Sequence, residues 1–183
     1  MADIFKHLSN RSLAHAVRFS AKPQHFEESV AEHSFFTTYI TSILCDLLQA
    51  ENVCINREKA LMMALVHDGE EIYSGDILSP FKRHSSEVKN AIKKVNQELI
   101  QEVFADLPKN IAERYIALWN EEGRQESIEA QVVKIADRIS LIGKCAEEVR
   151  AGNNFFKKIY DNELAALTDD TKDWWRKIKK HIF

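Results

Sequence analysis

Apolar residues recur at every third or fourth position along most of this chain, and this helical spacing limits the possible fold more than any other feature. Three stripes stand out: Phe36, Tyr39, Ile40, Ile43, Leu44 and Leu47; Val88, Ala91, Ile92, Val95, Leu99 and Val103; and Ile128, Val132, Ile135, Ile139, Ile142 and Val149. The 183 residues include only five glycines and three prolines, and no β-branched run alternates as a half-buried strand does. The sequence therefore predicts an all-α fold.

Signals at helix ends divide this pattern into about six or seven helices. Ser29 and Glu32 have the spacing of a capping box. Asparagine N-caps and C-terminal glycines are expected at Asn56, Asn110, Gly75 and Gly152. The expected helices span residues 2–8, 29–50, 57–73, 85–104, 109–121, 127–150 and 169–181, with residues 9–28 mostly irregular. We expect a single domain over residues 1–183, with a motif-bearing core at about 10–156 and a C-terminal helix at about 169–181.

Charge and cysteine content exclude several classes of protein. The net charge of −3 provides no general attraction to nucleic acid or to anionic membranes. No run approaches the ~18 apolar residues that span a membrane, and the first residues contain no apolar signal-peptide segment. The three cysteines form no CxxC pair and are expected as reduced thiols. We therefore expect a cytoplasmic protein that binds neither nucleic acid nor membranes.

Residues 61–76, LMMALVHDGEEIYSGD, place charged groups directly after an apolar run. Residues 61–66 are all apolar, and His67 and Asp68 follow at once. Charged groups seldom lie in a core unless something pairs with them or binds them. Neighbours on a helix point about 100° apart, so one ion can touch both only near the helix surface, with further ligands from other helices.

Two further residues have suitable settings for such ligands. His33 is the fourth helical residue after the Ser29 cap, and Asp137 lies beside the third apolar stripe. Two imidazoles and two carboxylates suit a first-row divalent metal such as Mn, Co, Fe, Ni or Zn, which lowers the pKa of a bound water. Glu71 follows His67 by four residues and Asp68 by three, so it faces the same side of the expected helix and could deprotonate that water. From the residues alone, a structural role for each of these side chains is the alternative.

The order His33, His67-Asp68, Asp137 resembles the signature of the HD superfamily of metal-dependent phosphohydrolases. Three blocks, SVAEHSFF, HDGEEIYSGDILSPFK and KIADRISLIGKCAEEVRAGNNFF, resemble the bacterial 5′-deoxynucleotidases of that superfamily, over about residues 10–156. The resemblance implies a single-domain HD-type helical bundle that is cytoplasmic and homodimeric. It also implies release of phosphate from deoxyribonucleoside 5′-monophosphates with one divalent metal, cobalt or manganese, with nickel, iron or zinc as alternatives.

The resemblance also assigns roles to residues of this chain. The metal ligands are expected at His33, His67, Asp68 and Asp137. Glu71 matches the acid that assists the attacking water, and Arg18 matches an arginine whose fixed fork of donors orients the phosphate. The expected substrate-binding residues are Arg18, Phe19, Asp68, Asp76, Ile77, Leu78, Ser79, Lys82 and Asp137. Among these, Asp76 would accept a hydrogen bond from a sugar hydroxyl, and Lys82 would add positive potential.

Two positions depart from the pattern of this family. Phe19 stands where a tryptophan usually crowds a 2′-hydroxyl, so the preference for deoxyribose depends on whether phenylalanine can do the same. Gly69-Glu70 stands where small residues are usual, and glycine inside a helix costs roughly 1 kcal/mol relative to alanine. Gly69 either gives a ligand room or has no function, and Glu70 is expected to be solvated. Core or interface anchors are expected at Trp119, Trp174 and Trp175.

Rival functions stay open from the sequence. A dNTP triphosphohydrolase would need several basic residues near the pocket, and the matched blocks supply chiefly Arg18 and Lys82. In related phosphodiesterases, a second metal needs two further histidines between the second and third motifs, where only His84 lies. A non-catalytic nucleotide-binding HD protein would be expected to lose a ligand or Glu71. A purely structural helical dimer would have no use for a buried cluster of two histidines and two aspartates.

Overall fold

The computed structural model describes residues 3–183, and every regular element in that range is helical apart from one isolated bridge between Val17 and Ser29. The elements are α1 (Ile4–Ser9), η1 (Ser12–Ala14), α2 (Val30–Ala50), α3 (Arg57–Val66), α4 (Glu71–Ser74), α5 (Ser79–Lys82), α6 (Ser86–Val103), α7 (Lys109–Arg124), α8 (Ile128–Arg150), η2 (Asn154–Phe156), α9 (Lys157–Thr168), α10 (Asp173–Ile178) and η3 (Lys179–His181). None of the helices in this range is long and apolar enough to cross a lipid bilayer. The predicted all-α fold is confirmed.

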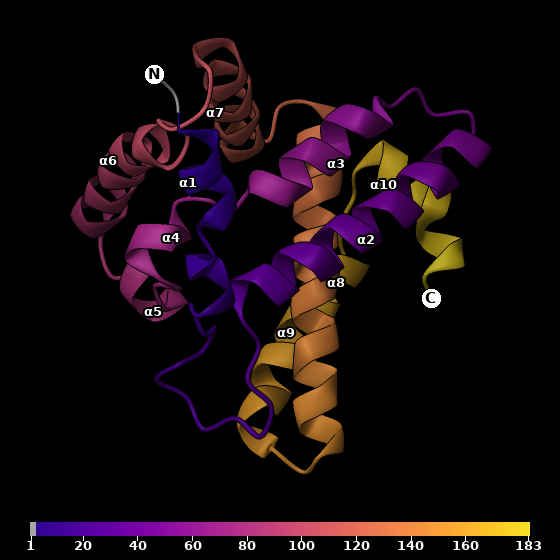
Figure 1. Ribbon diagram of the computed structural model, residues 1–183. Helices are drawn as coiled ribbons and strands as arrows, with labels where there is room; N and C mark the ends of the chain where they lie inside the picture. The colour runs from indigo at the N-terminus through magenta and orange to yellow at the C-terminus, as the bar shows by residue number, and fades with distance from the viewer. Residues whose placement is uncertain (1–2) are drawn as a thin grey trace.

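The centre of the molecule is the long helix α8, which α2 and α3 cross on one side and α9 accompanies on the other (Figure 1). The C-terminal helix α10 packs against α2. The buried core between these helices contains Leu44, Cys45, Leu48, Ile55, Ala60, Val132, Ile135, Ala136, Leu167, Trp174, Trp175 and Ile178. Trp174 and Trp175 are therefore core anchors, as the sequence predicts. This layer holds the segments that carry both histidines and both aspartates of the HD signature.

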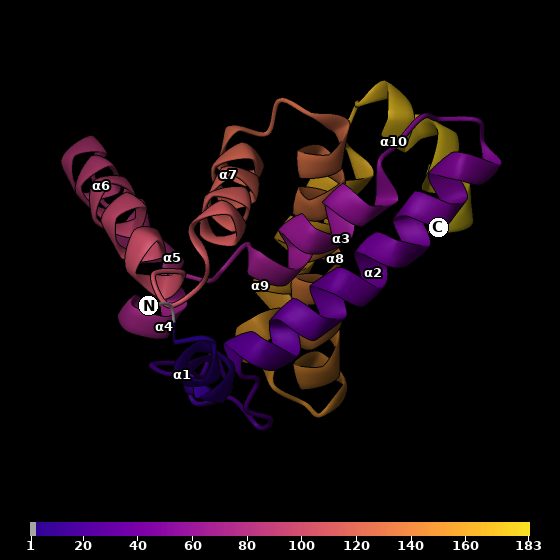
Figure 2. The same cartoon turned by 45° about the horizontal axis from the view of Figure 1, so that its top comes forward.

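A second buried cluster joins α3 to α6, α7 and α8. It contains Met63, Ala64, Val66, Ile100, Val103, Phe104, Leu118, Ala130 and Val133. Figure 2 shows that α6 diverges from α7 and from the body of the molecule toward its N-terminal end. Only the C-terminal end of α6 reaches the buried cluster, through Ile100 and Val103.

Most of the predicted helix ends agree with the structure. Ser29 and Glu32 form the expected capping box, and Asn56 accepts a hydrogen bond from the Lys59 N–H at the start of α3. Gly75 and Gly152 have φ values of 63° and 91°, a conformation that glycine adopts without strain. The predicted Asn110 cap is wrong, because α7 begins one residue after Pro108 without a side-chain cap.

The segment from 57 to 82 differs most from prediction. The expected helix 57–73 ends at Val66, and the chain turns at residues 67–70 before α4 begins. Gly69 explains part of this turn: its N–H bonds the Val66 carbonyl three residues back. A Cβ at Gly69 would lie 3.1 Å from that carbonyl oxygen and 3.3 Å from Cδ1 of Ile100. Glycine therefore allows the turn to approach α6.

Both ends of the chain also differ. The expected first helix starts at residue 2, which lies outside the described residues, and α1 begins at Ile4. The sequence analysis missed α9, although Tyr160, Leu164 and Leu167 recur at helical spacing. The C-terminal helix begins at Asp173, four residues later than predicted, and ends in the 3₁₀ turn η3.

The three apolar stripes are not buried equally. In the third stripe, Val132 and Ile135 are fully or almost fully buried. In the first stripe, the exposed fractions of Phe36, Tyr39 and Ile43 are 49%, 58% and 42%. The buried face of α2 is instead partly polar and consists of Val30, His33, Ser34, Thr37, Thr41, Leu44, Cys45 and Leu48.

Candidate active site

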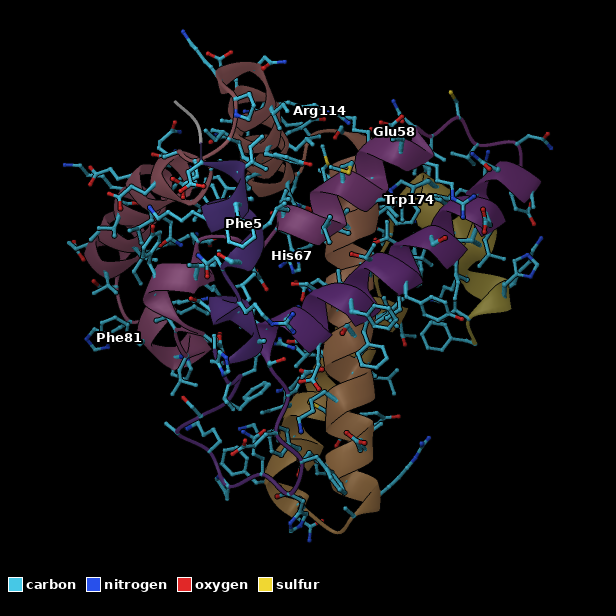
Figure 3. All side chains as sticks on the ribbon, in the orientation of Figure 1. Phe5, Glu58, His67, Phe81, Arg114 and Trp174 are labelled. Atoms are coloured by element: carbon cyan, nitrogen blue, oxygen red, sulfur yellow. The ribbon has the colours of Figure 1, made fainter. Side chains whose placement is uncertain are left out.

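Three residues of the HD signature, His33, His67 and Asp68, meet between α2 and the end of α3, and Asp137 on α8 reaches the His33 imidazole. Nε2 of His33 lies 3.4 Å from Nε2 of His67 and 3.2 Å from Oδ1 of Asp137. Nε2 of His67 lies 3.1 Å from Oδ2 of Asp68. Figure 3 labels His67, whose side chain lies beneath the end of α3 and faces α2. The predicted cluster is therefore present as a geometric arrangement.

Both imidazoles are held so that Nε2 faces the centre of the cluster. Nδ1 of His67 lies 2.8 Å from the carbonyl oxygen of Ala64, which can only accept, so Nδ1 carries the hydrogen. Nδ1 of His33 lies 3.1 Å from the hydroxyl of Ser140. Such partners fix the orientation and tautomer of metal-binding histidines. Sequence reasoning did not identify Ser140, which lies 107 residues from His33.

The spacing of these atoms fits one metal ion. Ligand atoms that share an ion at about 2.0–2.2 Å lie about 3.0–3.5 Å apart. The three cluster distances above are 3.1, 3.2 and 3.4 Å. One ligand atom from each of His33, His67 and Asp68 also lies within 4.8 Å of the others. Oδ1 of Asp137 lies close to one of these atoms, Nε2 of His33.

The carboxylates give the cluster a negative potential. Burial alone would lower the pKa of His67, but the adjacent Asp68 carboxylate raises it to about 10. Burial alone would raise the pKa of Asp137, but Lys134 and the two histidines hold it well below its usual range. Nζ of Lys134 lies 2.8 Å from Oδ2 of Asp137, an i,i+3 contact that sequence spacing could have revealed. A potential that attracts protons and a lysine also favours a metal cation.

Glu71 lies beside the cluster in a different way from the one predicted. It opens α4 after the turn, rather than continuing α3. Its side chain is buried, and burial together with the Asp68 carboxylate raises its pKa to about 8. Nζ of Lys82 lies 3.3 Å from its Oε1. The structure therefore joins two of the predicted residues, Glu71 and Lys82, through a direct ion pair.

Arg18 is held by Glu28, a residue that the sequence analysis did not identify. Nη1 of Arg18 donates to Oε2 of Glu28 at 2.7 Å, and both side chains are 11% exposed. The two backbones are also paired, since the Arg18 N–H bonds the Glu28 carbonyl at 2.8 Å. Burial would lower the pKa of Arg18, but Glu28, Asp68, Asp137 and Asp76 raise it. The guanidinium therefore lies in the negative field of the cluster.

Phe19 occupies a strained position next to Arg18. Its φ of 54° is in the left-handed region, which bulky residues rarely adopt. Its N–H donates to Oδ2 of Asp76 at 3.1 Å, and its ring packs edge-on against Phe156 at 5.3 Å. Asp76 thus joins the Arg18 loop to the segment after α4, where the predicted residues Ile77 and Leu78 are half-buried and Ser79 is exposed.

Glu70 is buried, so the prediction that it is solvated is wrong. Its exposed fraction is 8%, and its carboxylate accepts hydrogen bonds from the Trp119 indole N–H at 2.7 Å and from the Asn96 amide at 3.0 Å. Burial and the nearby Asp68 carboxylate raise its pKa to about 7. Glu70 therefore connects the turn at 67–70 to both α6 and α7.

A second unpredicted acid, Glu122, lies near the cluster on α7. It is half-buried. Burial raises its pKa, with Lys134 and His67 acting in the opposite direction. No sequence spacing links α7 to the HD signature, because the two meet only through the tertiary fold.

Comparison with known proteins identifies the family. The family model described as 5′-deoxynucleotidase YfbR-like matches residues 4–179. The chain belongs to this family. The resemblance seen in the three sequence blocks is thereby confirmed.

Individual relatives agree with this assignment. A 5′-deoxynucleotidase from Yersinia pseudotuberculosis is 29% identical over 182 residues, which cover 97% of this chain and 91% of the relative. A 5′-deoxynucleotidase from Yersinia pestis is 31% identical over 157 residues, which cover 85% and 78%. An HD-domain phosphohydrolase from Listeria innocua has a similar structure, with a TM-score of 0.79, 26% identity and coverage of 96% and 81%. The chain is therefore similar to hydrolases throughout its length.

Proposed function

We propose that this protein hydrolyses nucleoside 5′-monophosphates to nucleoside and phosphate, and that it prefers deoxyribonucleotides. The family assignment and the relatives support a phosphomonoesterase. The observation that carries the proposal is the meeting of two imidazole nitrogens and two carboxylates near a largely buried arginine. Together these groups can hold a cation and an anionic phosphate at one place.

The ion in this proposal is a single divalent transition metal held by His33, His67, Asp68 and Asp137. Cobalt or manganese is the first choice, with nickel, iron and zinc as alternatives that the same donor set accepts. Such an ion supplies Lewis acidity, which lowers the pKa of a water molecule and withdraws charge from phosphoryl oxygens.

Residues around the ligands bind the phosphate and move the proton. Arg18, fixed by Glu28, offers two parallel donors to phosphate oxygens and stabilises the charge that builds up on them. Lys82 adds positive charge near the same group. Glu71 accepts the proton of the attacking water, because burial and the Asp68 carboxylate raise its pKa and make its carboxylate a stronger base than an exposed one.

The sugar lies, in this proposal, between Phe19 and the segment from Asp76 to Ser79. Oδ2 of Asp76 accepts the Phe19 N–H, which leaves Oδ1 to accept a sugar hydroxyl. The φ of 54° at Phe19 is compatible with a ring held in place to crowd the 2′ position. Whether phenylalanine excludes a 2′-hydroxyl determines the preference for deoxyribose.

A panel of substrates tests the proposal. Phosphate release is measured from deoxy- and ribonucleoside 5′-monophosphates, with 3′-monophosphates as controls, first in EDTA and then with Mn, Co, Mg or Zn restored. The expected result is metal-dependent release from the 5′ compounds, faster for the deoxy set. Equal release from ribonucleotides would remove the deoxyribose preference, and no release from any 5′-monophosphate would reject the proposed activity.

The proposed assembly is a homodimer, as the resemblance implies. Its support in the structure is an exposed apolar surface on α2 and α3, where the exposed fractions of Phe35, Tyr39 and Leu65 are 63%, 58% and 55%. Large exposed aromatic patches are typical of interfaces between protein chains. Light scattering on the purified protein would give twice the chain mass, and Tyr39→Glu is expected to shift it toward the monomer.

A further inference from the structure

A groove of about 970 Å³ is lined by residues of α6 and α7 and of the segment before α6. Its volume is in the range of small-molecule sites. Every charged residue that lines it is basic, namely Lys82, Arg83, Lys89, Lys93 and Arg124. The whole chain has a net charge of −3, so this concentration of positive charge is a local feature of the α6–α7 surface.

The positive charge in the groove is only partly neutralised. Lys82 pairs with Glu71 at 3.3 Å, and Arg124 makes an exposed contact with Glu126 at 3.8 Å. Within residues 3–183, the other three basic residues of the groove form no ion pair with a carboxylate. Two of them, Lys89 and Lys93, are four residues apart on α6, where like charges repel. A bound polyanion would relieve this repulsion.

The remaining walls suit a nucleoside. The half-buried Trp119 and Ile92 provide apolar surface, and Asn96, Gln97 and Asn120 provide amide groups. At the start of α6, Ser85 and Ser86 also line the groove, and the N-terminal end of an 18-residue helix favours a phosphate there. Cationic, amide and apolar groups thus occur together, as recognition of a phosphate, a base and its ring requires.

We propose that the α6–α7 groove binds a nucleotide that carries two or more phosphates, at a site separate from the metal cluster. Four unpaired or weakly paired cations exceed the charge of one phosphate monoester, and they come from three segments of the chain. Nucleoside triphosphates match this number of charges and the size of the groove. The proposed site is for binding only and includes no ligand of the HD signature.

The groove shares two contacts with the candidate active site. Asn96 and Trp119 line the groove and donate to Glu70 at 3.0 and 2.7 Å. Lys82 lines the groove and pairs with Glu71. A bound triphosphate would draw Lys82 from Glu71 and add negative charge near an anionic substrate. If the proposed monophosphatase activity holds, occupancy of the groove raises the KM for the monophosphate.

The test measures binding of dATP and of inorganic tripolyphosphate to the intact, metal-loaded protein by calorimetry. Excess Mg²⁺ is present so that neither ligand removes the metal. Lys93→Glu is compared with Lys94→Glu, because both are exposed on α6 but only Lys93 lines the groove. We expect Lys93→Glu to weaken dATP binding about tenfold, which is about 1.4 kcal/mol. Lys94→Glu is expected to change it less than about twofold at physiological salt, where exposed charges are screened.

The outcomes separate the groove from the metal site. Equal dATP affinity in the two variants would overturn the proposal, because binding would then not involve the groove. dATP that binds no more tightly than tripolyphosphate would overturn the assignment to a nucleotide. If binding depends on Lys93 but no monophosphate is hydrolysed, the groove proposal stands and the proposed activity fails. A dATP-induced rise in KM that Lys93→Glu abolishes supports both.

Discussion

The HD-signature cluster and the α6–α7 groove both adjoin the turn at residues 67–70. The side chains are fixed by partners in the cluster, and the basic side chains of the groove are mostly free of them within the described part of the chain. In the cluster, each imidazole has a partner on Nδ1 and meets a carboxylate on Nε2. In the groove, Lys89 and Lys93 are exposed and lack ion-pair partners among residues 3–183. One region is buried and negative, and the other is open and positive.

This difference indicates what each region can bind. Fixed ligand atoms about 3 Å apart select a small cation, because their spacing leaves no room for a larger ligand. Flexible lysines around a groove of about 970 Å³ suit a larger anion that comes and goes. Glu70 and Glu71 lie between the two regions and contact the groove residues Trp119 and Lys82. The turn therefore lies between the proposed metal site and the proposed nucleotide site, in contact with residues of both.

The largest effect on phosphate release is expected from a change in the buried HD-signature cluster. Asp137→Asn removes one negative charge from the cluster with little change in shape, so we expect loss of bound metal and a fall in phosphate release of roughly 10³-fold or more. Elemental analysis and a phosphate assay measure the two effects. Asp161→Asn, at an exposed carboxylate on α9, is the control. Full metal content in Asp137→Asn would show that this residue is not a ligand.

The next largest effect on phosphate release is expected from Glu71, which lies between the cluster and the groove. Glu71→Ala is expected to leave metal content unchanged and to reduce phosphate release by roughly 10²–10⁴-fold, the usual contribution of a general base. Lys82→Ala, which removes its ion-pair partner, is expected to reduce release only a few-fold, since Lys82 supplies charge and accepts no proton. Steady-state kinetics on both variants checks this. Full activity in Glu71→Ala would reject its assignment as the base.

The long helices of the fold could be predicted from the sequence, and the short ones could not. Helices α2 and α8 were predicted to within a residue, because long apolar stripes and caps such as Ser29 and Glu32 specify them. The helices α4 and α5 contain four residues each, too few for a periodic pattern. The turn between α3 and α4 depends on the approach of Ile100 to Gly69, which is a tertiary contact.

The candidate site, too, could be predicted only in part from the sequence. The four signature residues could be chosen as candidates because each stands next to a buried helical segment, where a charged group needs an explanation, and because their order resembles the HD signature. Their role as metal ligands stays a prediction. The partners that hold the site residues could not be predicted, because Ser140 lies 107 residues from His33 and Glu28 lies 10 residues from Arg18. Glu70 was misjudged for the same reason: its partners Asn96 and Trp119 are 26 and 49 residues away.

A third test concerns the loop that carries Glu28. The buried Glu148 carboxylate holds this loop, accepting the backbone N–H groups of His25 and Phe26 at 2.9 and 3.0 Å and the Lys144 ammonium at 2.8 Å. Burial would raise the pKa of Glu148, but these donors lower it from 4.5 to about 2. Its contribution to stability is therefore present above about pH 4.5 and is lost as the pH falls toward 2.

Glu148→Gln is expected to lower the free energy of unfolding by about 3 kcal/mol at pH 7, because it leaves the buried Lys144 without its charged partner. Urea unfolding at pH 7 and at several acidic pH values measures the difference from the unmodified protein. That difference is expected to shrink as the pH falls below about 4.5, the ordinary pKa of the group. The exposed neighbour Glu147→Gln is the control, and a pH-independent difference between the proteins would contradict the assignment.

An effect on catalysis smaller than that of Glu71→Ala is expected from Glu28→Gln. The amide keeps the shape of the side chain but removes the charge that fixes the Arg18 guanidinium at 2.7 Å. A less ordered arginine binds the substrate phosphate more weakly before and during reaction, so we expect KM to rise about tenfold with a smaller change in kcat. Metal content should not change, because among the described residues the Glu28 carboxylate bonds Arg18 and none of the four signature residues. The exposed neighbour Glu27→Gln serves as the control. An unchanged KM would mean that Arg18 keeps its orientation through the backbone pairing of the two residues.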